Sequence, residues 1–216
     1  MGDMSSRPSA RSVKISDDER GGWSSDRPRR DGAPARPVDL TVHCNVLAPA
    51  DRLRYSPGSL LVVVCASHAE RDRFLDRLIE DRASLLSLAK VRTLLAGRVA
   101  EQELEARAQE LLRAAVSKRL QNRDTVVLAA ERLDADEREP FVRIAAALKR
   151  PRHLILIETA REQVREEDHA ALNELRRALD AGALGSEGFQ TALRLGGGSA
   201  GEVKRIVFRP PPREDD

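Results

Sequence analysis

The sequence contains few aromatic residues and has a net charge close to zero. Six aromatic side chains in 216 residues form no row of rings on which successive bases of a single-stranded nucleic acid could stack. The 37 basic side chains are almost balanced by 35 acidic ones, so the chain as a whole has no positive field to attract a phosphate backbone. Both shortages argue against a nucleic-acid-binding protein.

Cysteine, histidine clusters and long apolar runs are also scarce. Cys44 and Cys65 each lie in an apolar, strand-like run, where a free thiol usually behaves as a small hydrophobe, and we expect no disulfide. The four histidines are scattered without zinc-ligand spacing, which predicts no metal site. The longest apolar run, residues 60–66, is far shorter than the roughly 20 residues that span a bilayer. With no apolar signal-peptide core at the N-terminus, we expect a soluble cytoplasmic protein.

Composition divides the chain into three parts. Residues 1–37 are rich in Ser, Arg, Gly, Pro and Asp and lack apolar periodicity, which predicts a disordered tail. This tail is either simply solvated or a short arm that docks on a partner or touches phosphate. Residues 210–216 are Pro-rich and acidic and are expected to be disordered too. Residues 38–209 remain as one domain.

Strand-like and helix-like patterns alternate through this domain. Such alternation predicts an α/β fold with three layers, in which helices cover both faces of a mostly parallel sheet. Residues 60–64 form a continuous β-branched run, typical of a central strand buried on both faces. The other predicted strands are residues 39–46, 84–88, 124–129 and 153–158. The predicted helices include residues 90–96, 99–120 and 166–181. Two further helices are predicted, one after His68 and one that opens at a capping box formed by Asp134 and Glu137.

Two segments near the C-terminus alternate in polarity. Residues 189–195 and 202–208 are separated by three glycines, residues 196–198, and this pattern predicts a β-hairpin. A glycine run can also indicate a phosphate loop, but no helical pattern follows it directly.

The segment after the predicted central strand reads VCASHAERDRFL over residues 64–75. In its position within the strand and helix order, it resembles the phosphate loop of P-loop kinases of the polynucleotide-kinase-like (AAA/zeta-toxin-like) group, and the resemblance covers about residues 39–208. In that family the loop is Gly-rich and ends in Gly-Lys-Ser/Thr. The resemblance implies that Ser67 and His68 lie at degenerate nucleotide-binding positions, Arg71 at the lysine position and Asp72 at the position of the magnesium-binding hydroxyl.

The departures from the family motif argue against phosphate binding at this loop. None of its glycines is present, and a Cβ at those positions obstructs the backbone nest that binds anions. The carboxylates of Glu70 and Asp72 would repel phosphate, although Asp72 could touch a metal ion. His68 is either poised near a ligand cleft at the carboxyl end of the strand or simply faces solvent.

Three further motifs of the family are incomplete. In its Ser-x-Asp-x-x-Arg motif the general base is replaced by Ala89, whereas Arg92 is kept and could bind an anion bidentately or lie on the surface as an ordinary arginine. The strand tip at residues 126–133 lacks the family's aspartate, with Glu131 as a possible acidic substitute. Residues 158–168 are too few for the Arg-rich lid that closes over ATP.

Three functions remain open. The leading hypothesis is a catalytically degenerate P-loop-kinase-like domain, without cofactor, that serves as a binding, scaffold or regulatory module for a protein partner or a second copy of itself. The second is an atypical phosphotransferase or NTPase acting on nucleotides or polynucleotide ends, which would use ATP and magnesium with Arg71, Asp72, Arg92 and Glu131. The third is a non-hydrolytic binder of nucleic acid or of a phosphate-bearing ligand through the arginine-rich tail and Arg92.

Overall fold

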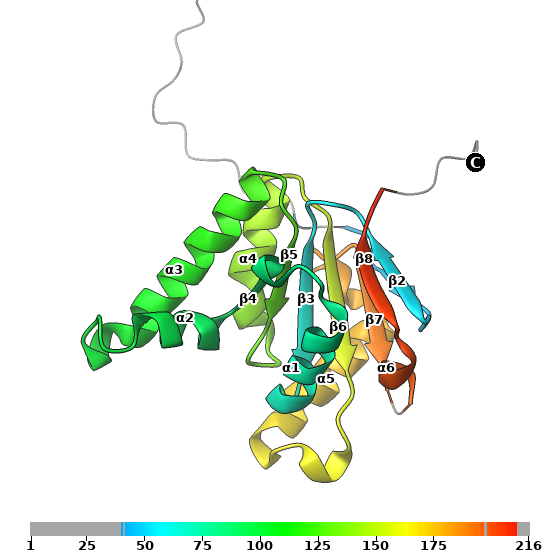
Figure 1. Ribbon diagram of the computed structural model, residues 1–216. Coiled ribbons are helices and arrows are strands. Elements are labelled where there is room, and N and C mark those ends of the chain that lie inside the picture. The colour runs from blue at the N-terminus through cyan, green and yellow to red at the C-terminus, as the bar shows by residue number, and fades with distance from the viewer. Residues whose placement is uncertain (1–39, 41, 197, 211–216) are drawn as a thin grey trace, which may run out of the picture. The chain divides into compact units, whose positions relative to one another are not determined.

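The computed structural model describes residues 40, 42–196 and 198–210 (Figure 1). They belong to the compact unit 37–216, and both predicted tails lie outside the described residues except for Pro210. The strands and helices are β1 (Asn45–Leu47), β2 (Arg52–Tyr55), β3 (Leu60–Cys65), α1 (His68–Leu78), β4 (Leu85–Ser87), α2 (Leu88–Leu95), α3 (Glu101–Gln121), β5 (Val126–Ala129), α4 (Ala135–Ala147), β6 (Arg152–Ile157), α5 (His169–Asp180), β7 (Thr191–Leu195), α6 (Ser199–Glu202) and β8 (Arg205–Phe208).

The predicted α/β fold is confirmed. Six strands form one parallel sheet in the order β1-β7-β6-β3-β5-β4. Strand β3 is central, as predicted, and all of its residues are buried between β5 and β6. Since chain order and spatial order diverge at β3, the carboxyl ends of β3, β5 and β6 are where an open α/β sheet is expected to bind a ligand.

Successive residues of β3 face opposite layers, because side chains alternate along a strand. Leu60, Val62 and Val64 pack into the core shared with α3, α4 and α5. Leu61, Val63 and Cys65 belong to the core on the other face, which is covered by α1 together with a two-stranded parallel sheet of β2 and β8 (Figure 1). The predicted three-layer arrangement is therefore confirmed, and the outer layer that contains α1 also contains the small sheet of β2 and β8.

The predicted C-terminal hairpin is wrong. Strand β7 runs parallel between β1 and β6, whereas β8 pairs in parallel with β2 after the short helix α6. The glycine turn leads into this helix because the Ser199 hydroxyl binds the backbone N–H and C=O of Gly196. Leu193 and Leu195 are fully buried, as befits an interior strand. Strand β2 corresponds to none of the strands predicted from the sequence.

Smaller differences concern the edges of elements. Of the predicted strand 39–46, only Asn45 and Val46 lie in β1, and residues 39 and 41 are outside the described residues. Leu111 of α3 is 44% exposed. Within the part of the chain described, no helix is both long and apolar enough to cross a membrane.

Candidate functional site

The connection between β3 and α1, which the resemblance predicts to take the place of a phosphate loop, is only two residues long, Ala66 and Ser67. Ser67 caps α1: its Oγ accepts from the N–H of Glu70 at 3.4 Å, and its carbonyl accepts from the N–H of Arg71 at 3.1 Å. Two N–H groups of the first turn are therefore used inside the protein. This is the geometry of an ordinary strand-to-helix turn.

Arg71, which was predicted from the resemblance to take the lysine position, points into the protein. Its side chain is 3% exposed, and Nη1 donates to the carbonyl of Ala130 just beyond β5. Nε and Nη2 donate to Oδ1 of Asp72 at 2.9 and 2.8 Å. The guanidinium joins α1 to the end of β5, and Asp72 serves as its counter-ion.

His68 makes a second link to the same strand tip. It is the first residue of α1 and is exposed, and its Nε2 lies 2.7 Å from the carbonyl oxygen of Glu131. A carbonyl can only accept, so Nε2 carries the proton in this contact. The imidazole therefore binds the backbone next to the carbonyl that Arg71 holds.

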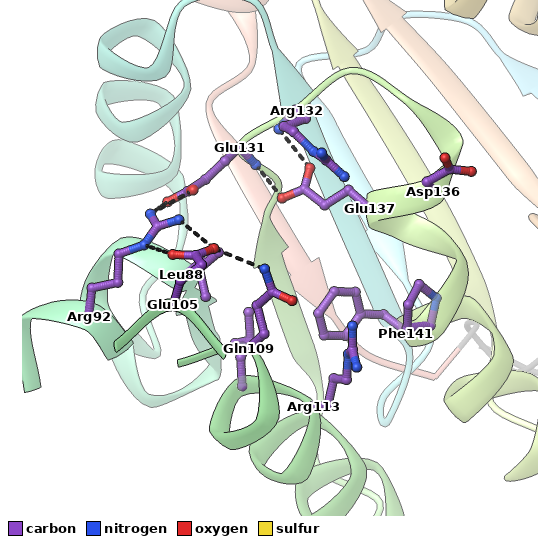
Figure 2. A pocket seen from close by; sticks show the side chains of 12 residues that line it. Leu88, Arg92, Glu105, Gln109, Arg113, Glu131, Arg132, Asp136, Glu137 and Phe141 are labelled. Atoms are coloured by element: carbon purple, nitrogen blue, oxygen red, sulfur yellow. Dashed lines mark hydrogen bonds and ion pairs between the residues drawn. The ribbon is translucent and has the colours of Figure 1, made fainter. Parts of the chain in front are cut away.

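Arg92 approaches the tip from α2 and is neutralised by two carboxylates (Figure 2). Its Nη1 donates to both carboxylate oxygens of Glu131 at 2.8 and 2.7 Å, and its Nε and Nη2 bind Glu105 of α3 at 2.7 and 3.0 Å. Gln109 donates to Glu105 at 2.9 Å. The bonds from Arg92 and Gln109 lower the pKa of Glu105, and the bond to Glu105 is the largest cause of the raised pKa of Arg92.

The loop after β5 is fixed from α4 as well. Oε1 and Oε2 of Glu137 accept from the N–H groups of Glu131 and Arg132 at 2.9 and 2.6 Å, and burial raises the pKa of this carboxyl. The predicted capping box is thus half right, since Asp134 accepts from the Glu137 N–H at 3.1 Å but Glu137 reaches further back along the chain. Arg138, which is buried, donates to the carbonyl of Leu133.

A cavity of about 180 Å³ lies between this loop and α2, α3 and α4 (Figure 2). It combines an apolar wall with charged side chains, and among the described residues no three His, Cys, Asp or Glu side chains are grouped to bind a metal ion. Its lining comprises Leu88, Leu112, Pro140 and Phe141 with Arg92, Glu105, Gln109, Arg113, Glu131, Arg132, Asp136 and Glu137.

A polar contact that was not predicted from the sequence lies next to the carboxyl end of β6. Thr159 Oγ1 donates to Glu70 Oε2 at 3.0 Å and lies 3.2 Å from Sγ of Cys65, whose thiol pKa is raised by burial. This contact joins α1 to the segment after β6. The rest of the segment as far as α5 contains two single 3₁₀ turns, at Arg161–Gln163 and Glu166–Asp168.

The structure therefore brings the sequence-predicted residues together around the tip of β5. His68 and Arg71 bind its carbonyls, Arg92 binds Glu131, and Ser67 and Asp72 support the same turn. Sequence reasoning missed Glu105, whose only signal was its place on a predicted helix, and assigned Glu137 only to a capping box. Comparison of the chain with protein-family models and with curated proteins found no match, so its function has to be argued from these contacts.

Proposed function

We propose that this chain is a catalytically degenerate P-loop-kinase-like domain that works as a binding or scaffold module with a protein partner in the cytoplasm. The observation that carries the proposal is the inward orientation of Arg71 beside a two-residue turn. The residue at the lysine position holds the protein's own backbone instead of facing a ligand.

Phosphate binding at this turn would disrupt existing contacts. Arg71 would have to leave the carbonyl of Ala130 and the carboxylate of Asp72, and the lost hydrogen bonds of a buried group cost about 1–3 kcal/mol. Glu70 adds negative charge to the first turn of α1, where a phosphate would arrive, and Asp72 follows two residues later. Repulsion and lost contacts both oppose nucleotide binding.

Phosphoryl transfer would also lack a base and a lid. Ala89 lies in the first turn of α2 at the general-base position of the resemblance, and a methyl group accepts no proton. The nearest substitute, Glu131, is paired with Arg92. The short connection through residues 158–168 contains only two single 3₁₀ turns and no α-helix that could close over a nucleotide and exclude water.

Isothermal titration of the full chain with ATP and magnesium tests the proposal. We expect no saturable binding up to millimolar nucleotide and no phosphate release above the buffer rate. The Asp72→Asn variant is the matched control, because it removes one repelling charge without removing Arg71. Micromolar binding of ATP by the wild type, accompanied by turnover, would instead establish the atypical enzyme.

A further inference from the structure

The two edges of the six-stranded sheet differ in how they are protected. At one edge, β4 is short, Leu85 and Ser87 are buried, and the ammonium of Lys90 donates to the carbonyl of Leu85 at 3.4 Å. At the other edge, all three residues of β1 are exposed, and β1 pairs with β7 but with no other strand in the described part of the chain. An unprotected edge is a template for another strand.

The open edge of β1 is centred on Val46. The N–H of Asn45 donates to the carbonyl of Gln190 at 2.8 Å, so the backbone groups of Asn45 face β7. Those of the next residue, Val46, face away from the sheet, because successive residues of a strand alternate in direction. The backbone at Val42, before β1, is covered by Gly185. The two lie so close that a Cβ added to Gly185 would be only 2.1 Å from the Val42 carbonyl oxygen.

The side chains and charges of this segment also differ from the rest of the surface. Val46 is 49% exposed and Leu47 is 37% exposed, and they are two of the four exposed large hydrophobic residues in the described chain. Residues 42–50 contain no Asp, Glu, Lys or Arg, although these types make up 33% of the chain. Charged side chains are a common protection of sheet edges, and here they are missing.

We infer that β1 pairs antiparallel with β1 of a second copy of this chain, across a two-fold axis at Val46. In such a contact each Val46 donates its N–H to the carbonyl of the other, which satisfies the groups that face outward. A two-fold contact places each surface against an identical surface, so a charged side chain at its centre would face a side chain of the same charge. A strand without charged side chains avoids this repulsion when it pairs with a second copy of itself. Pro49 ends the strand, so the contact is short and the dimer reversible. The inference does not depend on whether nucleotide binds.

Sedimentation equilibrium of the full chain over about a hundredfold concentration range tests this pairing. We expect a monomer–dimer equilibrium whose dissociation constant rises at least about tenfold in Val46→Lys, where two ammonium groups would meet. Leu94→Lys is the matched control, because Leu94 is 61% exposed but lies on α2, and its dimer should be unchanged. Circular dichroism verifies that both variants fold. A monomer at every concentration, or a dimer equally strong in Val46→Lys, would refute the pairing.

Cross-linking tests the register directly. Paired residues with reciprocal hydrogen bonds have Cα atoms about 5.5 Å apart, within the range of about 4.4–6.8 Å that a disulfide bridges. Val46→Cys should therefore form a disulfide-linked dimer under mild oxidation, whereas the native Cys44 and Cys65 are buried. Leu94→Cys should form no disulfide-linked dimer. Equal cross-linking of both variants would indicate random collision and contradict the proposed register.

Discussion

Replacing Arg71 by methionine is expected to lower the free energy of unfolding by about 3 kcal/mol. Methionine keeps much of the buried stem but removes the donor to the Ala130 carbonyl and the bonds to Asp72. Two elements, α1 and the end of β5, would lose a shared anchor at a side chain that is 3% exposed. Urea unfolding followed by circular dichroism measures the change.

The control is Asp72→Asn, which weakens the same ion pair from its solvent-exposed side. The Asp72 side chain is 55% exposed, so its loss should cost less than about 1 kcal/mol. A large effect at Arg71 with a small one at Asp72 identifies the contact with the β5 carbonyl as the stabilising interaction. If Arg71→Met left the free energy of unfolding unchanged but abolished nucleotide binding, Arg71 would be a phosphate ligand and not a structural anchor.

The parts of the fold that were predictable from sequence are those determined by local chemistry. Strands β3, β5 and β6 are buried on both faces, and β3, β5 and residues 154–157 of β6 read as continuous apolar runs. The side chain of Asp134 caps α4 by accepting from the N–H of Glu137, three residues away, and Gly182, with φ of 66°, follows the end of α5. Each of these signals lies within a few residues of its structural effect.

The predictions that were wrong concern features that depend on contacts between segments far apart in the sequence. The alternation in residues 202–208 indicates a half-buried strand but carries no information about its partner, which is β2 and not β7. The same limit applies to the site. Sequence position placed Arg71 beside the expected loop, but its direction is decided by the carbonyl of Ala130, 59 residues away. Likewise, nothing local marks Glu105 as the partner of Arg92.

A buried histidine on the opposite end of the sheet provides a measurable effect of pH. His153 in β6 lies 2.8 Å from the Thr191 hydroxyl through Nδ1, and its ring centroid is 4.7 Å from that of Tyr55. Its Nε2 and the hydroxyl of Tyr55 are buried without a hydrogen-bond partner among the described residues. Burial, assisted by the charge of Arg152, lowers the pKa of His153 from 6.5 to about 4.

This lowered pKa makes the folded state less stable in acid. Between pH 6.5 and about 4 the unfolded chain binds a proton at His153 that the folded chain does not, so the free energy of unfolding falls as the pH falls. The full loss, reached below the folded pKa, is about 3 kcal/mol. The carboxyl groups of Glu105 and Glu158 have lowered pKa values, so their contributions are lost mainly below their ordinary value of 4.5.

Glu137, whose pKa is raised by burial, affects the unfolding free energy above pH 4.5 as well, so a variant is needed to isolate the histidine. His153→Phe keeps a ring against Tyr55 but cannot bind a proton, so its unfolding free energy should vary less between pH 4.5 and 6.5 than that of the wild type. Urea unfolding at several pH values measures both curves, and the difference between them removes the titration of all other groups. His169 is the matched control, because its side chain is one-third exposed, and His169→Phe should leave the wild-type slope in place. Parallel curves for wild type and His153→Phe would mean that the imidazole is hydrated in the folded protein, since only access to water lets it accept a proton without unfolding.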